Sequence, residues 1–398
     1  MIILQINAVG EIGSTGRNCK EISDYINNYT SHTCYTAFAH GKKNRYSFQI
    51  GNIFEWKIHS LLSRIFGKQG YYSSIGTKKL IKFMDQIKPD VIHLNNLHAN
   101  YINLDLLFKY IENNNIGVVI TLHDCWFYTG KCTHYTLQKC YKWKNGCNFC
   151  PKLKEDNISW FFDRTSEMWK DKKRYFENIN KFAVIGVSDW ITKESRMSFL
   201  KNANFITRVY NWIDLSVFKQ KNVSFLKEEL KINDKFVILC VASGWSNKKG
   251  LDDFLLLANK LVEDYFIIIG KIPKINLPNN VIHINTTNDI NELVSFYCLA
   301  DVFLQLSKEE TFGKVVAEAL ACGTPVITNS LTANPELIGV NCGYIGNDLN
   351  EIIEKINLVR SKGKQFYSKN CRNFAENNFE MEDRIKEYIE IYEKLISV

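Results

Sequence analysis

The sequence predicts an α/β protein with two doubly wound domains, each built on a parallel sheet. A length of 398 residues exceeds what one ordinary hydrophobic core supports and suits two domains of about 200 residues each. The chain opens with an apolar strand, a glycine-containing turn and a helix, which is the first unit of a doubly wound sheet. A second series of short apolar strands alternating with helices begins at Phe236. We therefore expect an N-terminal domain over residues 1–212, a C-terminal domain over 213–378 and a final helix over 379–398.

The elements of the first domain follow from its apolar runs. Residues 1–8 indicate a buried strand, the turn G-E-I-G-S-T-G-R follows, and a helix is expected from about Asn18 to Tyr29. Gly13 and Gly16 of this turn would let the backbone come close to a phosphate, so both are candidate binding residues. Further strands are expected at 33–39, 91–94, 117–122 and 182–187.

The second domain shows the same alternation. Strands are expected at 236–241, 266–270, 281–284, 301–306 and 324–328, and a helix is expected from Lys314 to Cys322, ended by Gly323. The last segment, M-E-D-R-I-K-E-Y-I-E-I-Y-E-K-L, has the apolar periodicity of an amphipathic helix.

Composition and charge bound the cellular context. The content of 45% hydrophobic and 23% charged residues describes a soluble globular protein, and the N-terminus lacks the features of a signal peptide, so we expect a cytoplasmic protein. Residues 1–212 hold 29 Lys and Arg against 17 Asp and Glu, a net charge of +12. This half of the chain invites an anionic partner, and because no nucleic-acid-binding motif is present, the inner face of a membrane is preferred to nucleic acid. The segment Trp56–Lys68 is either a membrane-surface helix or a helix packed on the core.

Two carboxylates frame the start of the helix expected at Lys314. Glu310, with Glu309 as its competitor, precedes the helix, and Glu318 lies about a turn and a half inside it. A charge at Glu318 is costly within the apolar run V-V-A-E-A-L-A unless it is paired or faces a cleft. The backbone N–H groups of Phe312 and Gly313 suit an anion. Two carboxylates can bind neighbouring hydroxyl groups, and a helix N-terminus can bind phosphate or sugar oxygens. Together they predict a nucleotide-sugar site.

Other candidate residues follow strands, where side chains reach the ligand edge of an α/β sheet. Lys248 and Lys249 stand between a strand and a helix and form a natural clamp for a diphosphate. His123 directly follows the strand expected at 117–122. Asn96 and His98 follow the strand at 91–94 and are weaker candidates for the acceptor side.

Four cysteines form a separate cluster within an insertion at about residues 125–155. Cys132, Cys140, Cys147 and Cys150 predict a structural tetrathiolate zinc site, for which His134 is an alternative ligand. Free thiols and disulfides are the alternatives. In each case the cluster would not be the catalyst.

The segment S-K-E-E-T-F-G-K-V-V-A-E-A-L-A-C-G-T-P-V-I-T, from Ser307 to Thr328, resembles the signature of the retaining family-4 glycosyltransferases with the GT-B fold. Those enzymes carry paired glutamates before an A-C-G-x-P-V run. The chain departs from the family pattern where Trp212 replaces a glycine, where Gly244 stands near the place of an arginine, and at the pair 332–333, where relatives often have two glycines.

The resemblance implies two Rossmann-like domains facing a cleft, with the last helix crossing back to the first domain. It implies that Glu318 binds the ribose hydroxyls, that Lys249 with Lys248 binds the diphosphate, and that Glu310 and the 312–313 backbone hold the sugar. His123 would contact the donor sugar. No divalent cation would be needed for catalysis.

The expected activity is transfer of a hexose from a nucleotide-diphosphate sugar to a glycan or lipid-linked glycan, with retention of configuration, in surface polysaccharide biosynthesis. Two alternatives are kept. One is a sugar-nucleotide epimerase of the same architecture, which would need acid and base residues for elimination. The other is a non-catalytic, zinc-stabilised binding protein, which would bind metal and no nucleotide.

Overall fold

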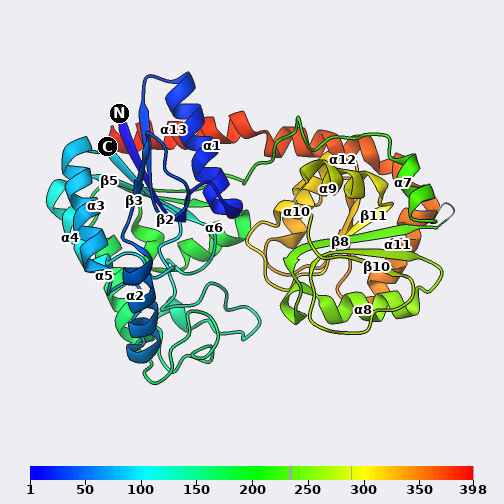
Figure 1. Cartoon of the computed structure of the whole chain (residues 1–398), viewed down its shortest axis with the longest axis horizontal. Helices are drawn as coiled ribbons and strands as arrows, with labels where there is room; N and C mark the ends of the chain where they lie inside the picture. Colours follow the sequence, from blue (N-terminus) through cyan, green and yellow to red (C-terminus); the bar gives the residue numbers. More distant parts are fainter. Residues whose placement is uncertain (233–234, 288, 398) are drawn as a thin grey trace. The chain divides into compact units, whose positions relative to one another are not determined.

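The chain forms two compact units in the computed structural model, which describes residues 1–232, 235–287 and 289–397. Unit 1 comprises Met1–Val209 and Ile385–Val398, and unit 2 comprises Tyr210–Arg384 (Figure 1). Each unit is built on its own parallel sheet. Parallel strands need crossover connections and cover on both faces, which explains the near-continuous apolar strands and the helices between them. No helix in the described part of the chain is long and apolar enough to cross a lipid bilayer.

Unit 1 contains a seven-stranded sheet in the order β3-β2-β1-β4-β5-β6-β7. The strands are β1 (Ile2–Val9), β2 (Thr33–His40), β3 (Ser47–Gln49), β4 (Val91–Leu94), β5 (Gly117–Leu122), β6 (Phe182–Gly186) and β7 (Phe205–Arg208). The helices are α1 (Gly13–Tyr29), α2 (Ile53–Phe66), α3 (Ser74–Ile87), α4 (Leu104–Asn114), α5 (Thr165–Glu177), α6 (Asp189–Arg196) and the last turns of α13 (Met381–Ile396), with 3-10 turns η1 (Lys142–Lys144) and η2 (Phe199–Asn202).

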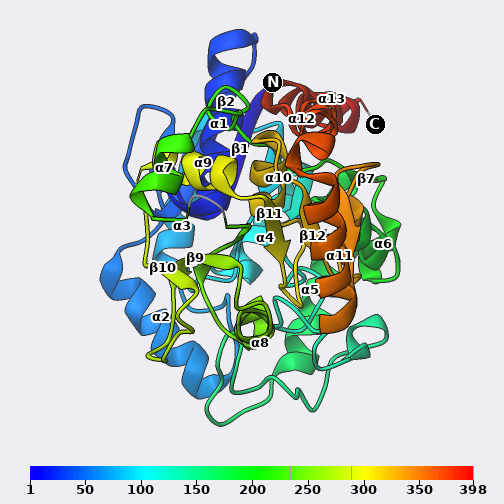
Figure 2. The ribbon, with the colours of Figure 1, turned by 90° about the vertical axis from the view of Figure 1, so that its right-hand side faces the viewer.

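Unit 2 contains a six-stranded sheet in the order β10-β9-β8-β11-β12-β13, with helices around its strands (Figure 2). The strands are β8 (Val237–Gly244), β9 (Tyr265–Lys271), β10 (Val281–Ile284), β11 (Val302–Gln305), β12 (Val326–Thr328) and β13 (Gly343–Ile345). The helices are α7 (Ser224–Glu229), α8 (Leu251–Lys260), α9 (Ile290–Leu299), α10 (Lys314–Ala321), α11 (Leu349–Lys362), α12 (Lys364–Phe379) and the first turn of α13, with 3-10 turns η3 (Asn247–Lys249) and η4 (Asn334–Leu337).

The strand order confirms the predicted fold class of two Rossmann-like units. In each unit the first strand lies inside the sheet, two strands follow on one side and the remainder on the other. The connections therefore leave in opposite directions from β1 and β4 in unit 1, and from β8 and β11 in unit 2. A crevice opens at the carboxyl ends of such a strand pair, and ligands of open α/β sheets bind there.

The start of α1 differs from the prediction. The helix begins at Gly13, five residues before the predicted Asn18, so the two glycines lie in its first turn and not in a separate turn. A Cβ added to Gly16 would lie 3.2 Å from the Val9 carbonyl oxygen and 3.2 Å from the Glu11 nitrogen. Glycine at this position therefore lets α1 pack closely against the end of β1.

The last turns of α13 pack within unit 1 against the middle of its sheet. Tyr392 and Tyr388 are both buried, and their hydroxyl groups lie 2.8 Å from His93 Nδ1 and 3.3 Å from Thr121 Oγ1. Burial lowers the pKa of His93 to about 3, so this histidine is neutral at physiological pH. His93, inside β4, therefore has a structural role.

Three buried lysines hold the irregular insertion between β5 and α5. Lys172 of α5 donates to the carbonyl oxygens of Trp126 (2.6 Å) and Thr129 (2.9 Å). Lys131 donates to the Leu153 carbonyl oxygen, and Lys152 to that of His134, both at 2.8 Å. All three are at most 2% exposed. Ammonium groups thus satisfy carbonyl groups that regular secondary structure would otherwise pair.

We expect Lys172→Met to lower the free energy of unfolding by roughly 1–3 kcal/mol, because it leaves buried carbonyl groups without a donor. Lys170→Met, on the exposed face of the same helix, is the matched control and should have little effect. Urea unfolding of both variants measures the difference. Equal stability of the two variants would contradict this role for Lys172.

Candidate active site

The candidate site in unit 2 lies at the carboxyl ends of β8 and β11. The loop after β8 carries η3, and the loop after β11 leads to α10. These loops are joined by the Lys308 N–H, which donates to the Lys248 carbonyl oxygen at 2.8 Å. A Cβ added to Gly250, which has a φ of +82°, would lie 2.4 Å from Leu306 Cβ. The close approach of the loops therefore depends on glycine at position 250.

Lys249 and Glu310, both predicted from the sequence, meet at this point. Lys249 Nζ lies 2.5 Å from Glu310 Oε1, and the side chains are 38% and 16% exposed. Glu309, the competing carboxylate, is buried. The ion pair therefore identifies Glu310 as the glutamate that shares a site with the lysine.

Thr332 fixes the backbone of Glu310. Its Oγ1 accepts a hydrogen bond of 3.0 Å from the Glu310 N–H, and its φ of +52° lies in the left-handed region. A β-branched residue is strained there, and glycine is not. Threonine in place of the family's glycine thus adds a side-chain contact to Glu310.

Glu318 lies in the second turn of α10, as predicted, and is half-buried. Its Oε2 accepts a hydrogen bond of 2.8 Å from the hydroxyl group of Tyr297 on α9. Tyr297 is fully buried, and burial together with the Glu318 carboxylate raises its pKa well above the usual range. Tyr297 therefore remains a donor that orients Glu318. The amino-acid sequence gives no sign of this contact, because 21 residues separate Tyr297 from Glu318 and no motif joins them.

The two residues before α10 have different roles: Phe312 packs its ring, and Gly313 leaves the backbone at the helix start without a side chain over it. The ring of Phe312 is buried between Tyr210 and Phe379, at centroid distances of 5.7 and 5.5 Å. Gly313 begins α10 with a φ of +88°. A Cβ at Gly313 would lie 3.3 Å from Gln305 Nε2, a buried amide nitrogen without a hydrogen-bond partner in the described structure. Gln305, for which the sequence gives no signal either, offers an unused donor beside the start of α10.

In unit 1, side chains that follow β4 are paired with side chains that follow β5. His123 Nε2 lies 2.9 Å from Asn95 Oδ1, and His98 Nε2 lies 2.9 Å from Asp124 Oδ2. The structure thus gives His123 a neighbour, Asn95, that was not among the candidates.

Asn96 lies instead beside the β1–α1 connection. Its N–H donates to Asn7 Oδ1 at 3.1 Å, and its Nδ2 lies 3.5 Å from Thr15 Oγ1. Asn96 therefore connects the ends of β1 and β4, the neighbouring strands from which the connections of unit 1 leave in opposite directions. Gly13, at the start of α1, has no atom within 4 Å of an added Cβ.

The contact between His98 and Asp124 favours the charged form of each side chain. Burial alone would lower the pKa of His98, but the Asp124 carboxylate outweighs it and the pKa is raised. Burial likewise opposes ionisation of Asp124, whose pKa is nevertheless lowered by His98 and by the Trp126 N–H. An imidazolium held by a carboxylate can donate a hydrogen bond or attract an anion.

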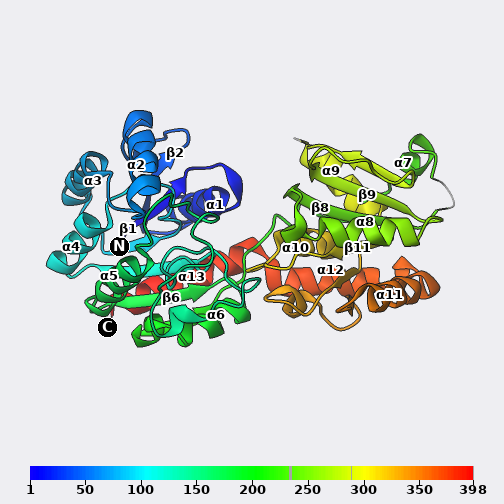
Figure 3. The same cartoon turned by 90° about the horizontal axis from the view of Figure 1, so that it is seen from below.

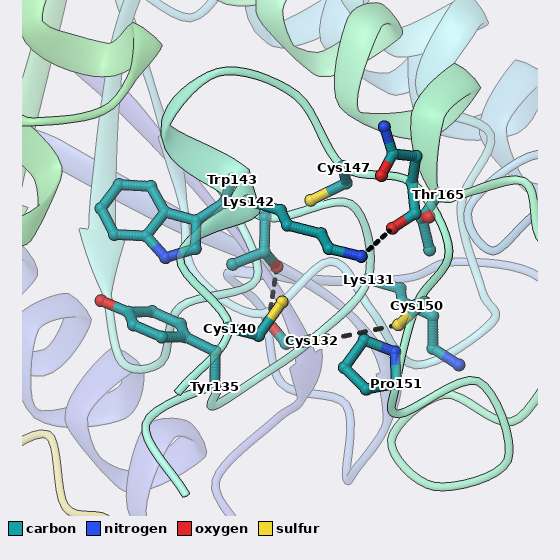
Figure 4. A pocket seen from close by; sticks show the side chains of 12 residues that line it. Lys131, Cys132, Tyr135, Cys140, Lys142, Trp143, Cys147, Cys150, Pro151 and Thr165 are labelled. Atoms are coloured by element: carbon teal, nitrogen blue, oxygen red, sulfur yellow. Dashed lines mark hydrogen bonds between the residues drawn. The ribbon is translucent and has the colours of Figure 1, made fainter. Parts of the chain in front are cut away.

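The predicted zinc site is not supported. The four cysteines of the insertion line one small cavity (Figure 4). The Sγ atoms of Cys132 and Cys150 are 4.0 Å apart, but within residues 1–232, 235–287 and 289–397 no group of three or more His, Cys, Asp or Glu side chains is placed to hold a metal ion. All twelve cysteines are free thiols, which agrees with the alternative of free thiols and not with a zinc site or with disulfides.

The residues of the unit 2 site lie within a segment that is similar to a known protein family. Residues 235–360 match the family described as "Glycosyl transferases group 1". These residues form a glycosyltransferase domain. The matched range contains both loops, the Lys249–Glu310 pair and Glu318.

Relatives of this glycosyltransferase include a protein named for a cps region and one named for colanic acid biosynthesis. It is 28% identical over 337 residues to an uncharacterized 41.2 kDa protein in the cps region of Klebsiella pneumoniae, covering 79% of this chain and 81% of that protein. It is 22% identical to the putative colanic acid biosynthesis glycosyl transferase WcaC of Escherichia coli, covering 77% of each.

Solved structures share the GT-B fold of this glycosyltransferase. A glycosyltransferase from Rickettsia africae has a TM-score of 0.68 at 15% identity and covers 99% of this chain and 98% of its own. Anabaena HepE in complex with UDP-glucose has a TM-score of 0.64 at 16% identity and covers 100% of both chains.

The His98–Asp124 pair predicts two opposite pH dependences. The stability from His98 is complete below its unfolded pKa of about 6.5 and is lost as the pH rises through the raised folded pKa. The stability from Asp124 is present above its unfolded pKa of about 3.9 and is lost as the pH falls through the lowered folded pKa.

We therefore expect an NMR titration of the His98 imidazole to give a midpoint above 6.5, and Asp124→Asn to lower it. Asn still accepts the Trp126 N–H, so the loop should keep its conformation. A midpoint that does not move in Asp124→Asn would show that the carboxylate is not the cause.

Proposed function

We propose that the protein transfers a hexose from a nucleoside-diphosphate sugar to a glycan or lipid-linked glycan, with retention of anomeric configuration, in the assembly of a surface polysaccharide. The observation that carries the proposal is the ion pair Lys249–Glu310 at the carboxyl ends of β8 and β11. It places a cation and a carboxylate beside the start of α10, where a helix dipole also favours an anion. The donor has a diphosphate for the cation and hydroxyl groups for the carboxylate.

The donor would be held in two parts. Glu318, oriented by Tyr297, accepts hydrogen bonds from the ribose hydroxyl groups. Lys249 and Lys248 bind the diphosphate, with the backbone at Gly313 facing it from α10. In this scheme the diphosphate competes with Glu310 for Lys249, so donor binding frees the Glu310 carboxylate for the sugar.

The chemical step needs no separate base in this proposal. The bond from the anomeric carbon to the diphosphate oxygen breaks, and a bond to the acceptor oxygen forms on the same face of the sugar. The acceptor proton passes to the departing phosphate oxygen. The cations and the start of α10 stabilise the negative charge that develops on the diphosphate. In unit 1, His123 with Asn95 is proposed to bind the sugar, and Asn96 and His98 the acceptor.

Names among the relatives support this reading. Anabaena HepE was solved with UDP and glucose, and an Escherichia coli relative is named O-antigen biosynthesis glycosyltransferase WclY. The epimerase alternative would produce an epimerised sugar nucleotide without acceptor, which is a distinguishing product.

A panel of UDP-, GDP- and ADP-sugars tests donor binding by calorimetry. We expect one donor to bind and Lys249→Ala and Glu318→Ala each to weaken it by about 10–100-fold, the loss of one or two charge-assisted hydrogen bonds. Lys260→Ala, an exposed lysine at the end of α8, is the control. The proposed site would be wrong if a donor bound equally well to Lys249→Ala and to the wild type.

Glu310→Gln separates binding from chemistry. It keeps the shape of the side chain but removes its charge, so we expect donor affinity to change by less than about threefold and transfer to fall by at least about 100-fold. Initial rates of sugar transfer or slow donor hydrolysis give the comparison. Full activity of Glu310→Gln would exclude a role for the carboxylate in the chemical step.

A further inference from the structure

Helix α2 exposes its apolar face and buries a more polar one. Phe54, Ile58 and Leu61 follow each other at helical spacing and are 75%, 58% and 50% exposed. The residues of α2 that are buried are Trp56, His59 and Ser63. A helix packed on a core shows the reverse pattern, so the outward face of α2 has the character of a surface that meets a partner. The helix lies at the edge of unit 1 in Figures 2 and 3.

The inward side chains hold α2 in this orientation. Trp56 Nε1 donates to the Ile50 carbonyl oxygen at 3.0 Å. His59 accepts from the Gly70 N–H at 3.1 Å through Nε2, so its Nδ1 carries the proton and donates to Ser73 Oγ at 2.7 Å. Burial lowers the pKa of His59 to about 3, so its imidazole stays neutral at physiological pH. Rotation of α2 to hide its apolar face would break all three hydrogen bonds.

A second segment extends the apolar surface. The Trp160 N–H donates to the Arg64 carbonyl oxygen at 2.6 Å, and a Cβ at Gly67 would lie 2.2 Å from the Phe162 carbonyl oxygen. Residues 160–162 therefore lie against the C-terminal end of α2. Their side chains, Trp160, Phe161 and Phe162, are 41%, 69% and 46% exposed. We call the surface formed by α2 and residues 160–162 the apolar rim.

Positive charges are interspersed with this apolar surface. Lys57 and Arg64 are exposed on α2, and neither forms an ion pair with another described residue. Neighbouring carboxylates are already engaged: Glu55 accepts from the Gly76 N–H at 2.9 Å, and Glu167 pairs with Lys68 at 3.2 Å. Unit 1 as a whole holds 31 Lys and Arg against 20 Asp and Glu, a net charge of +11.

We propose that the apolar rim binds the surface of an anionic lipid bilayer. Aromatic and aliphatic side chains would enter the boundary between headgroups and acyl chains, while Lys57 and Arg64 would remain at the level of the phosphates. The charge argues against a second copy of the chain as the partner, because two units of net charge +11 would repel each other. The proposal does not depend on the proposed function, since vesicle binding requires neither donor nor acceptor.

The test is co-sedimentation of the full chain with vesicles of phosphatidylcholine, with or without phosphatidylglycerol. We expect binding to the anionic vesicles that weakens with added salt. The triple variant Phe54→Ser, Ile58→Ser, Phe161→Ser should bind at least about tenfold more weakly. Phe225→Ser, Val340→Ser, Phe366→Ser in unit 2 is the matched control, because these side chains are similarly exposed, at 58%, 88% and 48%.

Charge and self-association are tested separately. Lys57→Glu with Arg64→Glu should remove the preference for anionic vesicles. Thermal unfolding of all variants should match the wild type, because the substituted side chains are exposed. No vesicle binding by the wild type, or an equal loss in the unit 2 control, would overturn the proposal. So would a concentration-dependent dimer that only the rim variant abolishes in analytical ultracentrifugation, which would show that the rim binds a second copy.

Discussion

The all-parallel pairing of both sheets is the constraint on which the rest of the structure depends. Parallel strands cannot be joined by tight turns, so each connection crosses a face of the sheet and every strand ends at the same edge. Where the first and fourth strands lie side by side, their loops diverge and leave a crevice. Lys249 and Glu310 are 61 residues apart, and they meet because β8 and β11 are neighbours there.

Unit 1 departs from regular packing in two places. The insertion after β5 has little regular secondary structure. Buried lysines donate to backbone carbonyl groups that would otherwise accept from backbone N–H groups. Helix α2 reverses the usual distribution of apolar and polar faces. Neither feature contributes a strand to the sheet. Both can therefore carry functions that differ between proteins of the same fold.

The proposed donor site combines residues with different physical roles. Lys249, Glu310 and Glu318 carry charge, whereas Tyr297, Thr332 and Gln305 orient or complete the site. A site of this kind depends on neutral groups as much as on charged ones, because a charged side chain is useful only when its rotamer is fixed.

The amino-acid sequence was enough to predict the fold class and to single out the charged residues of the proposed donor site. Strand–loop–helix periodicity is local, and the segment from Ser307 to Thr328 carries both glutamates within one run, so neither inference needed long-range information. No pattern in the sequence predicts the residues that orient these charged side chains. Tyr297 reaches Glu318 from another helix, and Asn95 reaches His123 from another strand.

Several other features depend on contacts between segments that are distant in the sequence. Helix α1 begins at Gly13 because it packs closely against β1, and the four cysteines of the insertion are free thiols around one cavity. The face of α2 that is buried is likewise set by contacts with distant segments. Periodicity alone cannot settle that orientation, since a stripe of apolar residues is the same in sequence whether it meets a core or a partner.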